Sequence, residues 1–228
     1  IKVDFIIWYA SRKIRTFRCF SFIFSFILER LNIIGMNSKK VKFIKKFLNI
    51  KSIRMLFLGF SSGLPILLVF STLSVWLVKA GVTRATVTMF SWAGLAYSFK
   101  FIWSPLVDNF KLPFGQFGHR KSWLLLSQIL IVISLIFISN TDPSIYLIAT
   151  AIGAIMIAVS SATQDIVIDA YRIESASQKM QGALSSMYIA GYRIAMLIAG
   201  AGSLYLASFF GAEDYNVEVW KKVYLIMA

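Results

Sequence analysis

The sequence lacks the residues that most catalytic and metal sites need. It holds one cysteine, Cys19, and one histidine, His119, which has no other residue of ligand type near it. One cysteine cannot form an internal disulfide, so a disulfide framework and a structural metal site are both excluded as the basis of the fold. Ser-His-Asp sets, glycine-rich phosphate loops and paired-cysteine motifs are also missing. We therefore expect a protein that is not an enzyme and has no bound cofactor or metal.

Charge is scarce as well. Only 15% of the residues are charged, 58% are hydrophobic, and the mean hydropathy is +0.72. This composition is typical of a membrane protein whose main surroundings are lipid. The net charge of +14 does not indicate a nucleic-acid partner, because residues 1–54 hold 13 basic and 2 acidic residues and the remainder only 11 and 8. The basic residues crowd before the first long apolar run, where retention in the cytoplasm explains them.

What the sequence has instead is long apolar runs. A bilayer core about 30 Å thick takes roughly 20 helical residues at about 1.5 Å each. Runs this long, without period-two alternation, must satisfy their backbone groups internally, which favours helices over barrel strands. The fold class predicted is therefore an all-α integral membrane protein, with five spans and the beginning of a sixth at residues 55–78, 85–106, 122–140, 143–164, 184–210 and 223–228.

The loop charges predict the orientation. Seven basic residues and no acid lie between Asn37 and the first span, so the N-terminus is predicted to be cytoplasmic. Counting spans then puts residues 108–121 and 165–182 inside and the loops at 140–144 and 211–218 outside. Lys79 and Arg84, in a short outer loop, are exceptions to the bias.

The N-terminal region divides into two parts by sequence. Residues 1–35 are a doubtful upstream segment, because the chain opens with Ile1 and Met36 begins a well-formed basic leader that runs over residues 36–54. A signal peptide fits the basic front and apolar middle of residues 1–35, but a cleavage site of small residues is missing. Residues 55–228 form the predicted transmembrane half-bundle.

Five motifs carry a resemblance to a known family. They are GFSSGLP (59–65), YSFKFIWSPLVDNF (97–110), LPFGQFGHRKSW (112–123), ATQDIVIDAYRIE (162–174) and GYRIAML (191–197). In order and spacing they resemble the AmpG-type muropeptide permeases of the major facilitator superfamily. The resemblance implies the N-terminal six-helix half of a transporter, its sixth helix incomplete, in the bacterial inner membrane. It also implies proton-driven import of anhydro-muropeptides, the sugar-peptide fragments of cell-wall turnover; this substrate comes from the resemblance alone.

The same resemblance implies a cytoplasmic gate latch. In the superfamily, the loop between the second and third spans begins with an acid and ends with a basic pair, which fits Asp108 with Arg120 and Lys121. The basic pair would reach an acid at the end of the fourth span, here Asp165 or Asp169. Arg172, three residues after Asp169, is close enough to pair with it. The alternative is a solvated helix end whose ion pairs contribute little.

Four further residues are candidates for substrate binding or coupling. Arg193 lies near the middle of the fifth span, where an arginine needs a cavity or a partner; it would bind a substrate carboxylate or form a structural pair. Lys100 either faces the cavity or extends toward the inner surface. Gln164 belongs to the family motif but could be a helix cap, and Gly63 either lines the site or allows close packing.

Three functions compete at this point. The first is a muropeptide-type transporter, the second a related transporter of another anion such as an acetyl-carrier nucleotide, and the third a non-transporting fragment. Alternating access needs two helical halves, and only one is evident here. We therefore expect a C-terminal half as the missing partner, and no transport by the 228-residue chain alone.

Overall fold

The computed structural model describes residue 44 and residues 46–112, 118–211 and 215–228. The chain divides into two compact units, Ile1–Ile53 and Arg54–Ala228, and the second holds nearly all of the described residues. The predictions for residues 1–35, and for the leader up to residue 43, lie outside the described residues.

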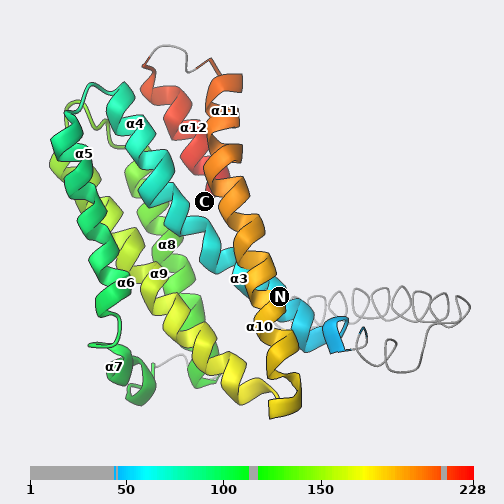
Figure 1. Cartoon of the computed structure of the whole chain (residues 1–228). Coiled ribbons are helices and arrows are strands. Elements are labelled where there is room, and N and C mark those ends of the chain that lie inside the picture. Colours follow the sequence, from blue (N-terminus) through cyan, green and yellow to red (C-terminus); the bar gives the residue numbers. More distant parts are fainter. Residues whose placement is uncertain (1–43, 45, 113–117, 212–214) are drawn as a thin grey trace, which may run out of the picture. The chain divides into compact units, whose positions relative to one another are not determined.

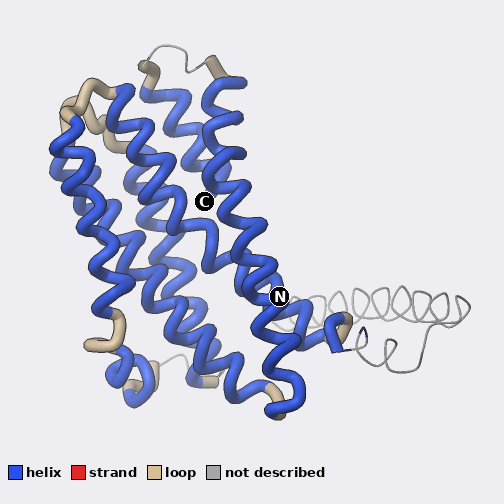
Figure 2. Tube along the Cα trace, viewed as in Figure 1, coloured by secondary structure: helices blue, strands red, loops and turns tan. Residues whose placement is uncertain are grey.

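The regular elements of the described residues are all helices (Figures 1 and 2). Within the described residues, four continuous helices are long and apolar enough to cross a membrane: Ile50–Lys79, His119–Ser139, Leu147–Ser175 and Gln178–Phe209. The first comprises α3 (Ile50–Leu67), η1 (Leu68–Thr72) and α4 (Leu73–Lys79); α8 and α9 are the second and third; the fourth comprises α10 (Gln178–Leu197), η4 (Ile198–Gly202) and α11 (Ser203–Phe209). The all-helical prediction is confirmed, and four of the five full-length runs correspond to these helices.

The second predicted run, 85–106, is not one helix. It consists of α5 (Arg84–Phe90), a 3₁₀ segment η2 (Ser91–Gly94) and α6 (Leu95–Phe99), and after a turn at 100–103 comes α7 (Ser104–Asn109). Pro105 lies in the first turn of α7, where its missing N–H costs least. In a continuous helix the Pro105 ring would clash with the carbonyl of Phe101, four residues earlier, so the chain turns before α7 instead of continuing α6.

The last element, α12 (Val217–Met227), begins six residues before the predicted start at residue 223. The Asn216 side chain accepts a hydrogen bond from the Glu218 N–H at 3.0 Å and caps the helix. In the sequence, the charges of Lys221 and Lys222 interrupt the apolar run, so the predicted span started after them. In the structure they lie beside the buried pair Trp220 and Tyr224 in a helix with an apolar face.

Large apolar side chains cover much of the surface of the second unit. Phe57 is 67% exposed, Ile148 79%, Tyr205 72% and Phe209 73%. In water such a surface would be a strong aggregation hazard, whereas lipid tails solvate it without cost. The described surface therefore suits a protein surrounded by lipid.

Helices α3 and α10 cross with their backbones in contact. A Cβ atom built on Gly59 would lie 2.1 Å from the Tyr188 carbonyl oxygen, and one on Gly191 would lie 1.9 Å from that of Leu56. Real carbon and oxygen atoms never approach so closely, so each position requires glycine. Small residues that let two helices approach are a common way of packing membrane helices, and here they fix how α3 lies along α10.

A π turn interrupts each of these two long helices, and the two turns face each other. In η1, the Thr72 hydroxyl donates to the Ala199 carbonyl of η4 at 2.8 Å and lies 2.7 Å from the Ser203 hydroxyl. The Tyr224 hydroxyl of α12 donates to the Leu68 carbonyl at 3.0 Å. π turns leave carbonyls poorly paired, and these hydroxyls satisfy them inside an apolar bundle.

Aromatic rings from α4 and α12 fill the neighbouring part of the core. Trp76 stacks on Trp220 with 5.9 Å between ring centroids and an interplanar angle of 9°, and its centroid lies 5.2 Å from that of Tyr224. All three side chains are buried. Together with the π turns, this packing joins α4, α11 and α12.

A hydrogen-bonded clamp joins two loops outside the long helices. The Tyr215 hydroxyl donates to Asp142 Oδ1 at 2.5 Å, and the Ser144 N–H and hydroxyl donate to the same atom at 2.9 and 2.6 Å. Burial alone would raise the pKa of Asp142, but the hydrogen bonds from Ser144 and Tyr215 outweigh it and lower the pKa below its usual value. Burial and the bond to Asp142 raise the pKa of Tyr215 to about 12. Both groups therefore keep the charge states that the clamp needs near neutral pH.

The close crossing predicts the effect of Gly191→Ala. The added methyl group must displace the α3 backbone, so we expect the free energy of unfolding to fall by about 3 kcal/mol or more. Gly182→Ala is the matched control, because Gly182 lies on the same helix with nothing within 4 Å of a built Cβ. We expect that control to be neutral or stabilising by up to about 1 kcal/mol. Thermal unfolding in detergent micelles, followed by circular dichroism, measures both, and equal behaviour of the two variants would contradict the crossing.

Candidate functional site

Six polar side chains from four long helices meet inside the bundle. The Ser61 hydroxyl of α3 accepts hydrogen bonds from Gln164 of α9 at 2.9 Å and from Gln128 of α8 at 3.3 Å. The next residue, Ser62, donates to the Asp165 carboxylate and lies 3.0 Å from the Tyr188 hydroxyl of α10. We call this set the polar cluster: Ser61, Ser62, Gln128, Gln164, Asp165 and Tyr188.

The polar cluster lies within the membrane-spanning helices. Asp165 is 18 residues beyond Leu147, the start of α9, which is about 27 Å along a helix axis, with ten residues of the same helix still to follow. Ser62 and Gln164 are buried, and among the described residues Gln164 Oε1 has no hydrogen-bond partner. A buried amide oxygen without a partner is costly, so this atom is available to a hydrogen-bond donor on a ligand.

Arg120 and Asp108, two residues of the predicted gate latch, form an ion-pair cluster with a different acid from the fourth span. Arg120 Nη1 lies 2.5 Å from Asp108 Oδ1, and its Nη2 and Nε lie 2.8 and 3.1 Å from Glu174 Oε1. This Arg120 cluster joins the end of α7, the start of α8 and the end of α9. It brings Asp108 and Arg120 together as expected, but the acid from the fourth span is Glu174 and neither Asp165 nor Asp169.

Position along α9 explains the difference. Glu174 is nine residues beyond Asp165, about 13 Å farther along the axis, at the level where Arg120 begins α8. Asp169 pairs instead with Arg172 on its own helix at 3.1 Å, as the spacing predicted. Arg172 also lies over the Tyr188 ring, 5.7 Å from its centroid. Lys121 is exposed and has no ion pair among the described residues.

The other predicted site residues take three different positions. Arg193 lies halfway along Gln178–Phe209, about 22 Å from the start of that helix, and is exposed without an ion pair among the described residues. Lys100 is half-buried in the turn after α6 and interacts electrostatically with Asp165. Gly63 faces the α10 backbone, since its Cβ would lie 2.5 Å from the Tyr192 carbonyl oxygen. Close packing therefore accounts for this glycine.

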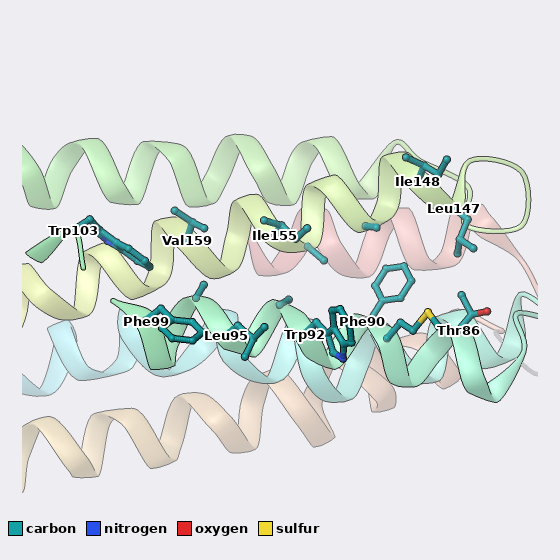
Figure 3. A pocket seen from close by; sticks show the side chains of 15 residues that line it. Thr86, Phe90, Trp92, Leu95, Phe99, Trp103, Leu147, Ile148, Ile155 and Val159 are labelled. Carbon is teal, nitrogen blue, oxygen red and sulfur yellow. The ribbon is translucent and has the colours of Figure 1, made fainter. Parts of the chain in front are cut away.

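A lateral cleft runs between α5–α6 and α9, and Figure 3 shows its labelled side chains in two facing rows. Its volume is about 630 Å³, and its lining includes no charged side chain. Phe90, Trp92 and Phe99 on one side face Leu147, Ile155 and Val159 on the other. Such a lining has few polar groups to orient a ligand, so the candidate site is the polar cluster and not this cleft. In the part of the chain that the structure describes, no group of three His, Cys, Asp or Glu side chains is arranged to hold a metal ion.

Sequence reasoning missed four members of the polar cluster: Ser61, Ser62, Gln128 and Tyr188. Hydroxyl and amide side chains are tolerated in apolar helices, so they stand out less than a charge does. One signal was present, since Ser61 and Ser62 stand inside the GFSSGLP motif between two glycines. If the face of α3 that contacts α10 had been known, the two serines would have been identified as site residues.

The Arg120 cluster is expected to slow the opening of the last turn of α9. Arg120→Gln removes both ion pairs, and an exposed pair contributes up to about 1 kcal/mol, so amide hydrogen exchange in the last turn of α9 should become about fivefold faster. Lys121→Gln removes a neighbouring exposed charge and should leave the exchange rate unchanged. Mass spectrometry of the deuterated chain measures both. A rate in Arg120→Gln equal to that in Lys121→Gln would show that the cluster does not hold the helix end.

Comparison with known proteins agrees with the motifs. A family model described as "Acetyl-coenzyme A transporter 1" matches residues 52–150. A protein from Rickettsia felis named as transporter AmpG 4 is 43% identical over 185 residues, which are 81% of this chain and 43% of that protein. The corresponding AmpG 4 protein of Rickettsia conorii is 41% identical, over 82% of this chain and 44% of its own length.

A relative with a more specific name is the anhydromuropeptide permease of Escherichia coli. It is 36% identical over 187 residues, which are 82% of this chain and 36% of the permease. The chain thus spans less than half the length of these relatives. Its four long apolar helices and these relationships describe a multi-pass membrane protein. Over about four fifths of its length, the chain belongs with the AmpG-type transporters.

Proposed function

We propose that this chain forms one helical half of a secondary transporter that imports anhydro-muropeptides across the bacterial inner membrane, driven by a proton gradient. The observation that carries the proposal is the 36% identity to an anhydromuropeptide permease along 82% of the chain. In this proposal the basic N-terminal region and the Arg120 cluster are cytoplasmic, as the distribution of Lys and Arg favours.

The polar groups in the membrane suit the chemistry of such a substrate. Anhydro-muropeptides present carboxylates, peptide N–H groups and sugar hydroxyls. Arg193 offers a forked donor for a carboxylate at mid-span, and the free Oε1 of Gln164 offers an acceptor for an N–H. An arginine at this depth needs a polar partner or a water-filled cavity, because lipid solvates a charge poorly.

The exposed side of α10 that bears Arg193 also suggests a partner. Ile189 is 55% exposed and Leu197 70%, on either side of the arginine along the helix. The relatives are more than twice as long as the matched segment, which leaves length for a second set of helices. We propose that this set covers the Arg193 side of α10 and that the substrate binds between the two halves.

The Arg120 cluster acts in this scheme as the cytoplasmic latch. It holds the ends of α7, α8 and α9 in one arrangement through two acids and one guanidinium. Because the acids are about half exposed, the pairs are weak enough to break during a transport cycle. Gly63 contributes by letting α3 and α10 pack closely, and Asp169 with Arg172 stabilises the inner end of α9.

One alternative substrate class has support of its own. The family model that matches residues 52–150 is described for an acetyl-coenzyme A transporter, so a nucleotide carrying an acetyl group is a second candidate. Both substrates are anionic, and Arg193 would serve either. Competition in an uptake assay separates them.

Uptake by a chimera tests the proposal. Residues 54–228 replace the matching segment of the E. coli anhydromuropeptide permease, in cells that lack their own permease. Labelled anhydro-muropeptide should then enter saturably, and only with a proton gradient. Saturable entry of labelled acetyl-coenzyme A, without entry of muropeptide, would favour the alternative.

Arg193→Ala in this chimera should reduce uptake at least about tenfold, because a hydrogen-bonded charge contributes about 1.5–3 kcal/mol. Arg193→Lys should restore it only in part, since an ammonium group cannot reproduce the planar fork. Leu197→Ala, one turn farther along the same exposed side, is the matched control and should keep full uptake. Unchanged uptake by Arg193→Ala would contradict the binding role, and loss of the protein from the membrane would indicate a structural one.

A further inference from the structure

We propose that Asp165 is the residue that binds and releases the coupling proton, with Lys100 as the cation whose attraction to it the proton removes. This inference rests on the proposed function and names the group that performs its energy coupling. The step is a simple protonation, in which one carboxylate oxygen gains a proton and becomes a carboxylic acid while Lys100 remains an ammonium ion.

Elimination among the acids of the described residues points to Asp165. Asp108 and Glu174 pair with Arg120, and Asp169 pairs with Arg172. The two others, Asp142 and Glu218, lie in the loop before α9 and in the first turn of α12. Asp165 is thus the carboxylate that combines a place inside a long apolar helix with the lack of an ion pair. A carboxylate in that position is expensive to keep charged and indicates a role.

The hydroxyls around Asp165 can serve both of its protonation states. A serine hydroxyl has one proton, so when Ser62 donates to Asp165, Tyr188 must be the donor to Ser62 at 3.0 Å. When Asp165 carries the proton, it can donate to Ser62, and Ser62 can donate to Tyr188. The chain of hydrogen bonds then runs in the opposite direction, with every heavy atom in place. In both states Ser62 keeps a hydrogen bond to each of its two neighbours, which suits a group that exchanges protons repeatedly.

The charges that face Asp165 come from three neighbouring elements. From the turn after α6, Lys100 attracts the carboxylate, and its side chain has no hydrogen bond or ion pair among the described residues. From its own helix, Asp169 repels it, although Arg172 offsets that charge. Tyr97 of α6 and both Tyr188 and Tyr192 of α10 also interact with it. When Asp165 is protonated, Lys100 is therefore the cation that loses its electrostatic attraction to the carboxylate.

This link gives the proton a mechanical consequence. Lys100 lies in the break between α6 and α7, the turn where the second predicted span is interrupted. Protonation of Asp165 removes one of the attractions between that turn and α9, while the hydrogen bond that Trp103 donates to Thr163 of α9, at 3.2 Å, remains. Since Asp165 is only partly buried, a proton can reach it without opening the helix packing at the buried Ser62.

The direct test is infrared difference spectroscopy on the full 228-residue chain in lipid nanodiscs, titrated with acid. We expect a carboxylic acid band that is absent in Asp165→Asn, present in Asp165→Glu and unchanged in Glu218→Gln, the control at an exposed acid of α12 that is not among the charges facing Asp165. Lys100→Gln should let the band persist to higher pH, because loss of a nearby cation favours the neutral acid. A band that survives in Asp165→Asn would overturn the proposal.

Transport gives a second, separable readout in the chimera. In Asp165→Asn, the rate of uptake against a concentration gradient should fall at least about tenfold. Exchange of substrate across the membrane should continue, since exchange needs no net proton movement. Glu218→Gln, at an exposed acid of α12, should keep both. Concentrative uptake by Asp165→Asn at the parent rate would overturn the coupling role. If the parent chimera does not transport muropeptide at all, the proposed function fails while the infrared result still decides whether Asp165 takes the proton.

Discussion

The pairing of two long helices, Ile50–Lys79 and Gln178–Phe209, is the constraint on which the rest of the structure depends. Glycines 59, 63 and 191 allow the backbones to touch, and farther along the same pair the π turns η1 and η4 exchange hydrogen bonds through Thr72. Lipid offers no water to a loose polar group, so a shift of one helix against the other would leave several hydrogen-bonding groups unpaired. The same alignment of the two helices therefore both packs their backbones and pairs their polar groups.

The candidate site depends on that register. With α3 and α10 in contact, Ser62 lies between Tyr188 and Asp165, and Ser61 lies within reach of Gln128 and Gln164. The two neighbouring serines thus serve two different groups of partners, one of amides and one with a carboxylate. Close packing by glycine at this crossing has a functional result as well as a structural one. It brings the Ser62 hydroxyl within hydrogen-bonding distance of both Asp165 and Tyr188.

How much of this could be predicted depends on the strength of each signal. Long apolar runs predicted the helices, since lipid leaves the backbone few choices, and the motif pattern indicated the family and the Asp108–Arg120 pair. The break at Lys100–Trp103 was missed because Pro105 was treated as part of a span, and the start of α12 was missed because Lys221 and Lys222 masked its apolar face. Asp165 was assigned to the latch because sequence distance along α9 does not reveal which neighbour each turn meets; only the position of Arg120 at the start of α8 distinguishes Asp165 from Glu174.

The helix pairing can be measured directly by a disulfide across the two π turns. Thr72 Oγ1 and Ser203 Oγ lie 2.7 Å apart, so cysteines at both positions, with Cys19 replaced by serine, are close enough to bond. Oxidation in native membranes should convert Thr72→Cys/Ser203→Cys almost completely to the cross-linked form. Thr72→Cys with Ser208→Cys, where Ser208 is exposed on the same helix, should remain reduced. Cross-linking of the second pair but not the first would contradict the register on which the polar cluster and its proposed role depend.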